Sequence, residues 1–116
     1  MMKYKIREYK LKNGMQGLSI IFEEEKYQLL SMFLGSDVTQ FAEWIKQEFD
    51  KVISGRSEYE KISGNVCSIE ITPDMTRIYD DLAENPMEDF CEINTVELRE
   101  LIEKWCSAVS EYKNNN

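Results

Sequence analysis

The strongest constraint on the fold is the last quarter of the chain, which has the pattern of a capped amphipathic helix. Asn94 suits an N-cap, Glu97 completes a capping box three residues later, and Ile93 can pack against Leu98 as a hydrophobic staple. Apolar residues then recur at helical spacing: Leu98, Leu101, Ile102, Trp105, Val109 and Tyr112. A helix with one apolar face has to be covered, so the rest of the chain must supply a surface that packs against it.

A second segment, in the first half of the chain, has the same helical period. Its apolar residues are Val38, Phe41, Ile45, Phe49 and Val52. Asp37 is a plausible N-cap, with Gln40 completing a capping box, and Gly55 stands where a helix C-cap is expected. The sequence therefore predicts a helix that begins at Asp37 and ends near Gly55.

The N-terminal segment alternates like a β-hairpin, and Asn13-Gly14 is a strong signal for a two-residue type I′ turn. With such a turn, the apolar residues share a face only if the first strand carries one extra residue. We therefore predict a β-bulge near Arg7-Glu8 that aligns the whole apolar set. That set is Tyr4, Ile6, Tyr9, Leu11, Leu18, Ile20 and Phe22.

Three more strands are predicted, over 27–34, 61–71 and 75–82, and Ala83 to Glu92, which contains Asn85-Pro86, is predicted to be a loop. The element order is β-β-β-α-β-β-α. This order favours an α+β fold: a single domain over residues 1–116, with residues 113–116 frayed. We expect one antiparallel sheet of about five strands with two main helices packed on one face.

Composition argues against an enzyme. The chain has no histidine, so the common nucleophile–histidine arrangements cannot form. Phosphate-binding glycine loops and calcium-loop patterns are absent from the sequence, and we expect no catalytic residue, cofactor or metal site. A small enzyme that uses carboxylates alone, Asp80 or Asp81 for example, remains the weakest alternative.

The cysteines and the hydropathy profile indicate where the protein works. Cys67, Cys91 and Cys106 have long, irregular spacing that fits neither a disulfide framework nor a zinc site, and we expect buried structural thiols. The basic N-terminus has no apolar run behind it, and no apolar stretch approaches the length of a membrane span. We therefore expect a soluble, cytoplasmic protein, with a monomer favoured.

The net charge of −8 lies within one stretch of thirty residues. Between Asp74 and Glu103 the chain has ten carboxylates and two bases, whereas the other 86 residues hold twelve of each. The helix glutamates Glu97, Glu100 and Glu103 are interpreted as an ordinary solvated face. The six remaining carboxylates of the strand end and loop form the candidate partner-binding site: Asp80, Asp81, Glu84, Glu88, Asp89 and Glu92. A carboxylate surface of this kind suits a basic protein partner.

Two other features have a functional and a structural interpretation. The first strand carries a basic set that could meet nucleic acid: Lys3, Lys5, Arg7, Lys10 and Lys12. The overall charge opposes phosphate binding, and lysines on a strand edge also prevent unwanted pairing, so we favour a solvated edge strand and expect no direct contact with nucleic acid. Trp44 could anchor an interface, but a place in the core is favoured.

Several segments carry a resemblance to a known class of proteins. They are the short first strand with Ile6-Arg7-Glu8, Asp37 followed by Phe41, and the run DFCEINTVEL over 89–98 that leads into LIEKW at 101–105. With these segments the chain resembles the small acidic immunity proteins of bacterial polymorphic-toxin and contact-dependent growth inhibition systems, and distantly the YacL-like family.

The resemblance implies a one-to-one inhibitor, made in the cytoplasm, that occludes the active site of a cognate toxin domain. Many such toxins are basic nucleases, often cleaving tRNA. Because these families diverge strongly, the resemblance transfers no binding residues. The alternative interpretation is a housekeeping adaptor or scaffold of the YacL-like type that has no toxin partner.

Overall fold

The computed structural model describes residues 2–85 and 90–115. The elements, in chain order, are β1 (Tyr4–Lys10), β2 (Gln16–Phe22), the short 3-10 helix η1 (Glu25–Tyr27), α1 (Gln28–Met32), the π-helical segment η2 (Phe33–Val38), α2 (Thr39–Ile53), β3 (Glu60–Ser63), β4 (Cys67–Ile71), β5 (Met75–Asp80), β6 (Phe90–Asn94) and α3 (Thr95–Asn114).

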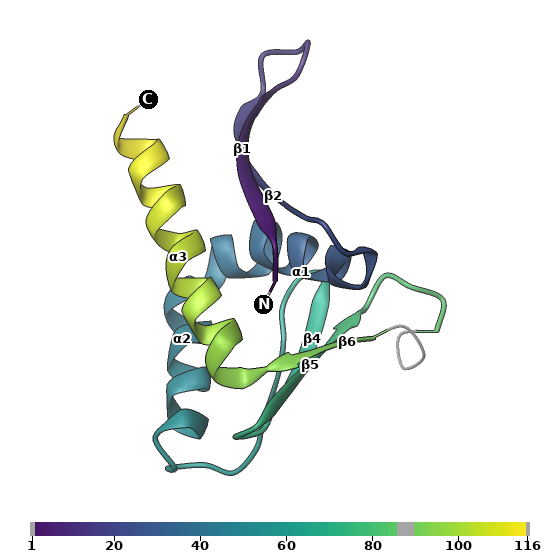
Figure 1. The fold of residues 1–116 in the computed structure, drawn as a ribbon, viewed down its shortest axis with the longest axis vertical. Coiled ribbons are helices and arrows are strands. Elements are labelled where there is room, and N and C mark those ends of the chain that lie inside the picture. The colour runs from purple at the N-terminus through teal and green to yellow at the C-terminus, as the bar shows by residue number, and fades with distance from the viewer. Residues whose placement is uncertain (1, 86–89, 116) are drawn as a thin grey trace.

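The α+β class and the two main helices are confirmed, but the strands form two sheets where one of about five strands was expected. Within the described residues, β1 and β2 make a two-stranded sheet, and the other strands make an antiparallel sheet in the order β3-β4-β5-β6. The helices lie against one face of the four-stranded sheet, and the hairpin projects from the helical layer (Figure 1).

The hairpin register corrects the predicted β-bulge. Ile6 pairs with Ile20 as expected, but the pairing is regular through Arg7-Glu8. The extra residue lies in the turn, because Leu11 donates to the Met15 carbonyl at 2.7 Å and encloses three residues that end in Gly14 at a φ of 91°. A three-residue turn with a left-handed glycine contains one residue more than the predicted two-residue turn, so it aligns Ile6 with Ile20 without a bulge in the strand. Tyr9 and Leu11 consequently face away from the core.

The strand predicted over 27–34 is wrong, because the chain is helical from η1 through α2. The run is apolar almost throughout, and such a run fits a buried strand or a buried helix equally well. The buried residues decide the outcome, since they recur at helical spacing: Leu30, Phe33, Leu34 and Val38. The predicted apolar stripe of α2 is confirmed at Ile45, Phe49 and Val52, and Gly55 follows the helix with a φ of 84°.

Asp37 is not an N-cap. It lies inside η2 with 1% of its surface exposed, and its carboxylate accepts three backbone hydrogen bonds from the turn between β3 and β4. The donors are the N–H groups of Asn65 at 2.8 Å, Val66 at 3.2 Å and Cys67 at 2.9 Å. Gly64 lies so close that a Cβ there would stand 2.4 Å from the Asp37 carboxyl carbon. One buried carboxylate therefore joins the helical layer to the sheet.

That turn also corrects the single strand predicted over 61–71, which is a hairpin of β3 and β4. The Met75–Leu82 strand is confirmed as β5, the antiparallel partner of β4, while β6 begins at Phe90 within the segment expected to be a loop. The inward side chains of the sheet form the core with the helices: Ile62, Cys67, Ile69, Ile71, Ile78, Cys91 and Ile93.

The start of the C-terminal helix is confirmed, because the Asn94 side chain accepts the Glu97 N–H at 2.9 Å. Polar contacts then fix α3 against α2. The Arg99 guanidinium pairs with Asp50 at 3.0 Å, and Lys46 pairs with Glu103 at 3.2 Å. Glu103 is therefore part of a network between the helices.

The structure also bears on the thiols and on membrane insertion. Cys67 and Cys91 are buried and Cys106 is half-buried, and all three are free. Burial raises the pKa of the Cys67 thiol to about 12 and that of Cys91 to about 11. Among the described residues, no helix has the length and apolar character needed to cross a membrane.

Replacing Asp37 with alanine should lower the free energy of unfolding by about 3 kcal/mol, because three backbone N–H groups, including that of the buried Cys67, lose their charged acceptor. Urea unfolding followed by circular dichroism measures this loss. Gln40→Ala is the matched control, since Gln40 reaches the same turn through an exposed contact to the Asn65 amide at 2.5 Å and should cost under about 1 kcal/mol. Equal losses in the two variants would contradict the role given to Asp37.

The folded protein should also react with Ellman's reagent at no more than one thiol, Cys106, because thiolates rather than thiols are the nucleophiles. In denaturant all three cysteines should react. Fast labelling of Cys67 or Cys91 in the folded protein, tested in single-cysteine variants, would contradict the burial described above.

Candidate partner-binding face

Four of the six carboxylates predicted to bind a partner lie among the described residues, at and beside the β5–β6 end of the four-stranded sheet. Asp80 and Asp81 end and follow β5, Glu84 lies in the connection to β6, and Glu92 is within β6. Glu88 and Asp89 fall outside the described residues. The structure therefore brings Asp80, Asp81 and Glu84 to the end of β5, while Glu92 lies along β6 opposite Arg77.

Asp80 and Asp81 are held by the turn that follows β5. The Asp80 Oδ1 accepts the backbone N–H of Leu82 at 2.9 Å. The Asp81 carboxylate accepts the Ser68 hydroxyl at 2.7 Å, and its backbone N–H donates to the Val66 carbonyl at 3.0 Å. These contacts fix the carboxylates in place, and Asp81 remains exposed to solvent.

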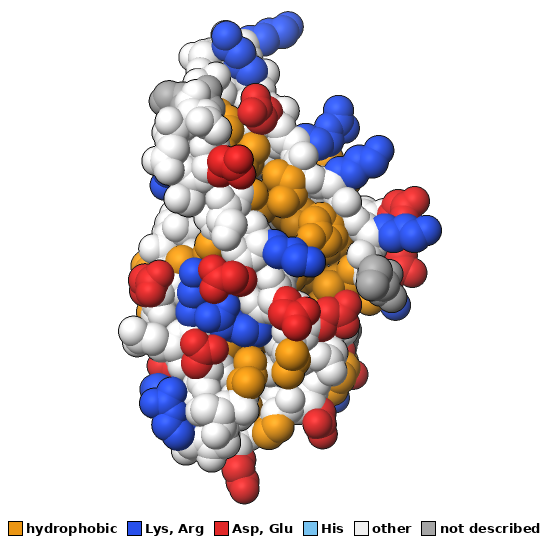
Figure 2. All heavy atoms as spheres, turned by 60° about the vertical axis from the view of Figure 1, so that its left-hand side comes forward, with side chains coloured by type: hydrophobic (Ala, Val, Ile, Leu, Met, Phe, Trp, Pro, Cys, Tyr) orange, Lys and Arg blue, Asp and Glu red, His pale blue; other side chains and the backbone are white. Residues whose placement is uncertain are grey.

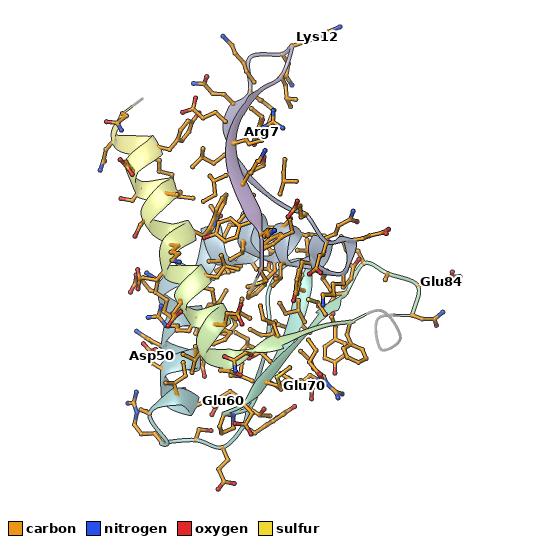
Figure 3. The ribbon with its side chains drawn as sticks, viewed as in Figure 1. Arg7, Lys12, Asp50, Glu60, Glu70 and Glu84 are labelled. Atoms are coloured by element: carbon orange, nitrogen blue, oxygen red, sulfur yellow. The ribbon has the colours of Figure 1, made fainter. Side chains whose placement is uncertain are left out.

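Glu84 is the most open of the four. Its side chain projects from the connection between β5 and β6, away from the body of the protein (Figure 3). Within the described residues it has no ion-pair partner. Leu82, two residues earlier, is 70% exposed. This connection therefore presents an unpaired carboxylate beside an exposed apolar side chain.

Glu92 is paired within the protein. Its Oε2 accepts the Arg77 Nε at 2.7 Å, and the Arg77 guanidinium lies over the Phe90 ring, 4.8 Å from its centre. The hydrogen bond to Glu92 raises the pKa of Arg77 above its usual value. Arg77 is thus held between a carboxylate and an aromatic ring, and half of its side chain is exposed.

The pairing of the strands explains why these side chains meet. Lys61 pairs with Glu70, Glu70 with Arg77, and Arg77 with Glu92, so that one row across the sheet alternates in charge. Because side chains alternate between the faces of a strand, the buried inward set forces this row onto the opposite side. We call this side the outer face and define it by Tyr59, Lys61, Glu70, Arg77, Tyr79, Phe90 and Glu92.

Glu70 lies at the centre of the outer face, between two tyrosines. The Tyr59 hydroxyl donates to its Oε2 at 2.5 Å, and the Tyr79 hydroxyl donates to its Oε1. These hydrogen bonds lower the pKa of Glu70, chiefly the one from Tyr59, while the pKa of Tyr59 is raised to about 12 and that of Tyr79 is also raised. Glu70 is therefore ionised and both hydroxyls are protonated at neutral pH.

The aromatic rings complete the outer face. Tyr79 and Phe90 pack with ring centres 5.8 Å apart, and Tyr79 is almost fully covered. Phe90 and Tyr59 remain 42% and 48% exposed, and Met75 on the same strand as Arg77 is 38% exposed. The described residues hold no group of three or more Asp, Glu or Cys side chains that could bind a metal ion. The arrangement suits binding to another macromolecule.

The sequence analysis did not identify Tyr59, Glu70, Tyr79 and Phe90. Alternation in Cys67–Ile71 placed Glu70 on a polar side, but only the strand pairing brings both tyrosines to it. Trp44, for which a core position was favoured, is 40% exposed on α2 and contacts Phe41 edge-on, with ring centres 6.2 Å apart.

The basic set predicted for the first strand occupies a different part of the molecule from the candidate carboxylates. Lys3, Lys5 and Arg7 alternate along one side of β1, and within the described residues none of them has an ion-pair partner. Arg7 and Lys12 lie on the projecting hairpin, far from Glu70 and Glu84 (Figure 3). On the helical side, blue side chains extend from the hairpin end and acids and bases mix lower down (Figure 2). The unpaired bases of the hairpin are therefore well separated from Glu84, while acids and bases mix on the helices.

Comparisons with known proteins place this arrangement in a family. No family model matches the chain, and no solved structure matches it. Among curated proteins, an immunity protein from Bacillus cereus is 40% identical over 89 residues, which cover 77% of this chain and 76% of that protein. Identity at this level over most of both chains establishes common descent, and the chain therefore belongs to the family of this Bacillus cereus immunity protein.

Proposed function

We propose that this protein binds a cognate bacterial toxin domain, one to one, and neutralises it. The observation that carries the proposal is the extended similarity to the Bacillus cereus immunity protein. The structure is consistent with binding to another protein. One face of the four-stranded sheet presents charged side chains and exposed aromatic rings, which is typical of a protein-binding surface.

We further propose that the toxin domain is basic and that it is a nuclease. Its substrate in this proposal is RNA, and tRNA in particular. Enzymes that act on nucleic acids collect Lys and Arg around their active sites because the substrate is a polyanion. The carboxylates of Asp80, Asp81, Glu84 and Glu92 would take the positions of phosphates and occlude that site. Charge complementarity of this kind speeds association and rejects acidic competitors.

The proposal includes a polymorphic-toxin or contact-dependent growth inhibition system as its setting. In such a system the toxin gene lies next to the gene for its inhibitor. A YacL-like adaptor would have no toxin neighbour, so the two functions make different predictions about the product of the adjacent gene.

Cells that express the toxin domain of the adjacent gene should stop growing, and co-expression of this protein should restore growth. The two proteins should also co-purify as a 1:1 complex, measured by multi-angle light scattering. A toxin of an unrelated type supplies the control and should not be neutralised. Continued growth arrest with no co-purification would contradict the immunity function and favour the adaptor.

Within the complex, the double variant Asp81→Asn and Glu84→Gln should slow association about three- to tenfold at low salt and reduce its salt dependence, because two steering charges are lost. Stopped-flow association at several ionic strengths measures both effects. Glu43→Gln with Glu111→Gln is the matched control, since it removes the same charge from exposed positions on α2 and α3. Equal effects in the two double variants would show that only the net charge of the protein matters for association. They would contradict a specific role for Asp81 and Glu84.

A further inference from the structure

The outer face combines exposed side chains with a network of contacts between them. An antiparallel sheet with one solvated face usually presents polar side chains there, yet Tyr59, Phe90 and Met75 are each more than a third exposed on this side. The opposite face is filled by the buried core beneath the helices. Among the described residues, no helix covers the outer face (Figure 1).

The side chains of this face are held in place before any partner arrives. Glu70 accepts both tyrosine hydroxyls, Phe90 packs on Tyr79, and Arg77 is fixed by Phe90 on one side and by Glu92 on the other. Binding normally costs the entropy of ordering each flexible side chain. On the outer face, contacts within the free protein already order Glu70, Arg77 and Tyr79, so binding loses less side-chain entropy there.

The kinds of residue are those that dominate protein–protein interfaces. Tyrosine and arginine are enriched among the few positions that carry most of the binding free energy, and phenylalanine is enriched in interfaces generally, particularly where polar groups surround an apolar centre. On the outer face, Tyr59 precedes β3 and Phe90 lies on β6, so these two exposed rings stand at opposite edges of the sheet with Glu70 between them. Glu92 and Asp81 lie on the same side of the sheet, and Glu84 follows in the connection from β5 to β6.

Charge distinguishes this face from the exposed apolar residues of the hairpin. Tyr9, Leu11, Met15 and Ile21 are also exposed, but they belong to the hairpin, which carries five bases and one acid between Lys3 and Gln16. On the outer face Lys61 and Arg77 offset Glu70 and Glu92, so the excess negative charge comes from Asp81 and Glu84 beyond the end of β5. A basic partner is attracted to that end of the sheet and repelled by the hairpin. The two apolar surfaces therefore cannot serve the same basic partner equally.

We propose that the outer face is the centre of the toxin interface, with Phe90 and Tyr59 as apolar anchors at its two edges and with the carboxylates between and beside them as its charged contacts. The occupant is a basic surface of the toxin, from which Lys or Arg side chains reach Glu70, Glu84 and Glu92 while apolar atoms cover the Phe90 ring. This inference rests on the proposed immunity function and adds the place and chemistry of contact. The Arg77 guanidinium covers part of the Phe90 ring and carries a positive charge, so a toxin surface that fits here must leave room for it and offer it no basic side chain.

Phe90→Ala and Tyr59→Ala should each raise the dissociation constant for the toxin domain of the adjacent gene at least tenfold, because each removes an anchor. The change should appear as faster dissociation, with little change in salt dependence. Surface plasmon resonance at two salt concentrations measures both. Trp44→Ala and Tyr9→Ala are matched controls, since these aromatic residues have similar exposure, 40% and 42%, and should change the constant less than twofold.

Thermal unfolding of each variant separates lost contact from lost folding. Tyr59→Ala removes an exposed ring and one hydrogen bond to Glu70 but no core contact, so it keeps the test decisive if Phe90→Ala unfolds. Wild-type affinity in Tyr59→Ala and in folded Phe90→Ala, with the carboxylate variants still impaired, would overturn this placement and leave the immunity function intact. Loss of affinity in the hairpin variant Tyr9→Ala alone would assign the interface to the hairpin. Failure of the unmodified protein to bind would instead refute the immunity function itself.

Discussion

The structure depends on the carboxylate of Asp37, which lies within the helical layer and accepts three N–H groups from the turn between β3 and β4. A buried charge is costly unless it is well hydrogen-bonded, and here the backbone supplies the donors. Gly64 leaves the room that the carboxylate needs. The contact holds the β3–β4 turn and the first residue of β4, Cys67, against the helical layer.

The register of the sheet decides the composition of the outer face. Cys67, Ile69 and Ile71 of β4 point into the core, so Ser68 and Glu70 must point outward, where Ser68 binds Asp81 and Glu70 binds the two tyrosines. A slip of one residue would exchange the two sets. The same packing that stabilises the fold therefore assembles the surface that we propose contacts the toxin.

The elements that sequence predicted well have signals within a few residues of one another. The cap at Asn94 and the stripe of α3 are local, and so is Gly55 at the end of α2. The errors concern choices that only distant contacts settle. The apolar run over 27–34 becomes helical because of what packs on it, and Asp37 finds its partners about thirty residues away.

In the candidate site, too, local signals were read correctly from the sequence, whereas contacts between distant residues were not. Charge counting singled out Asp80, Asp81 and Glu84, which lie at the end of β5 and in the connection that follows it. It could not show that Glu92 is paired with Arg77 or that Asp81 binds Ser68, because those contacts come from strand pairing. Tyr59 and Phe90 had no local signal, since exposed aromatic residues are recognised only once the buried ones are known.

Hydrogen–deuterium exchange of this protein, with and without the toxin domain of the adjacent gene, tests the central claim most directly. If the carboxylates and rings of the outer face meet the toxin, amide exchange should slow at residues 81–85, along the edge strand β6 and around Tyr59, and should be unchanged in the β1–β2 hairpin. Protection confined to the hairpin, with residues 81–85 and β6 exchanging as in the free protein, would contradict it.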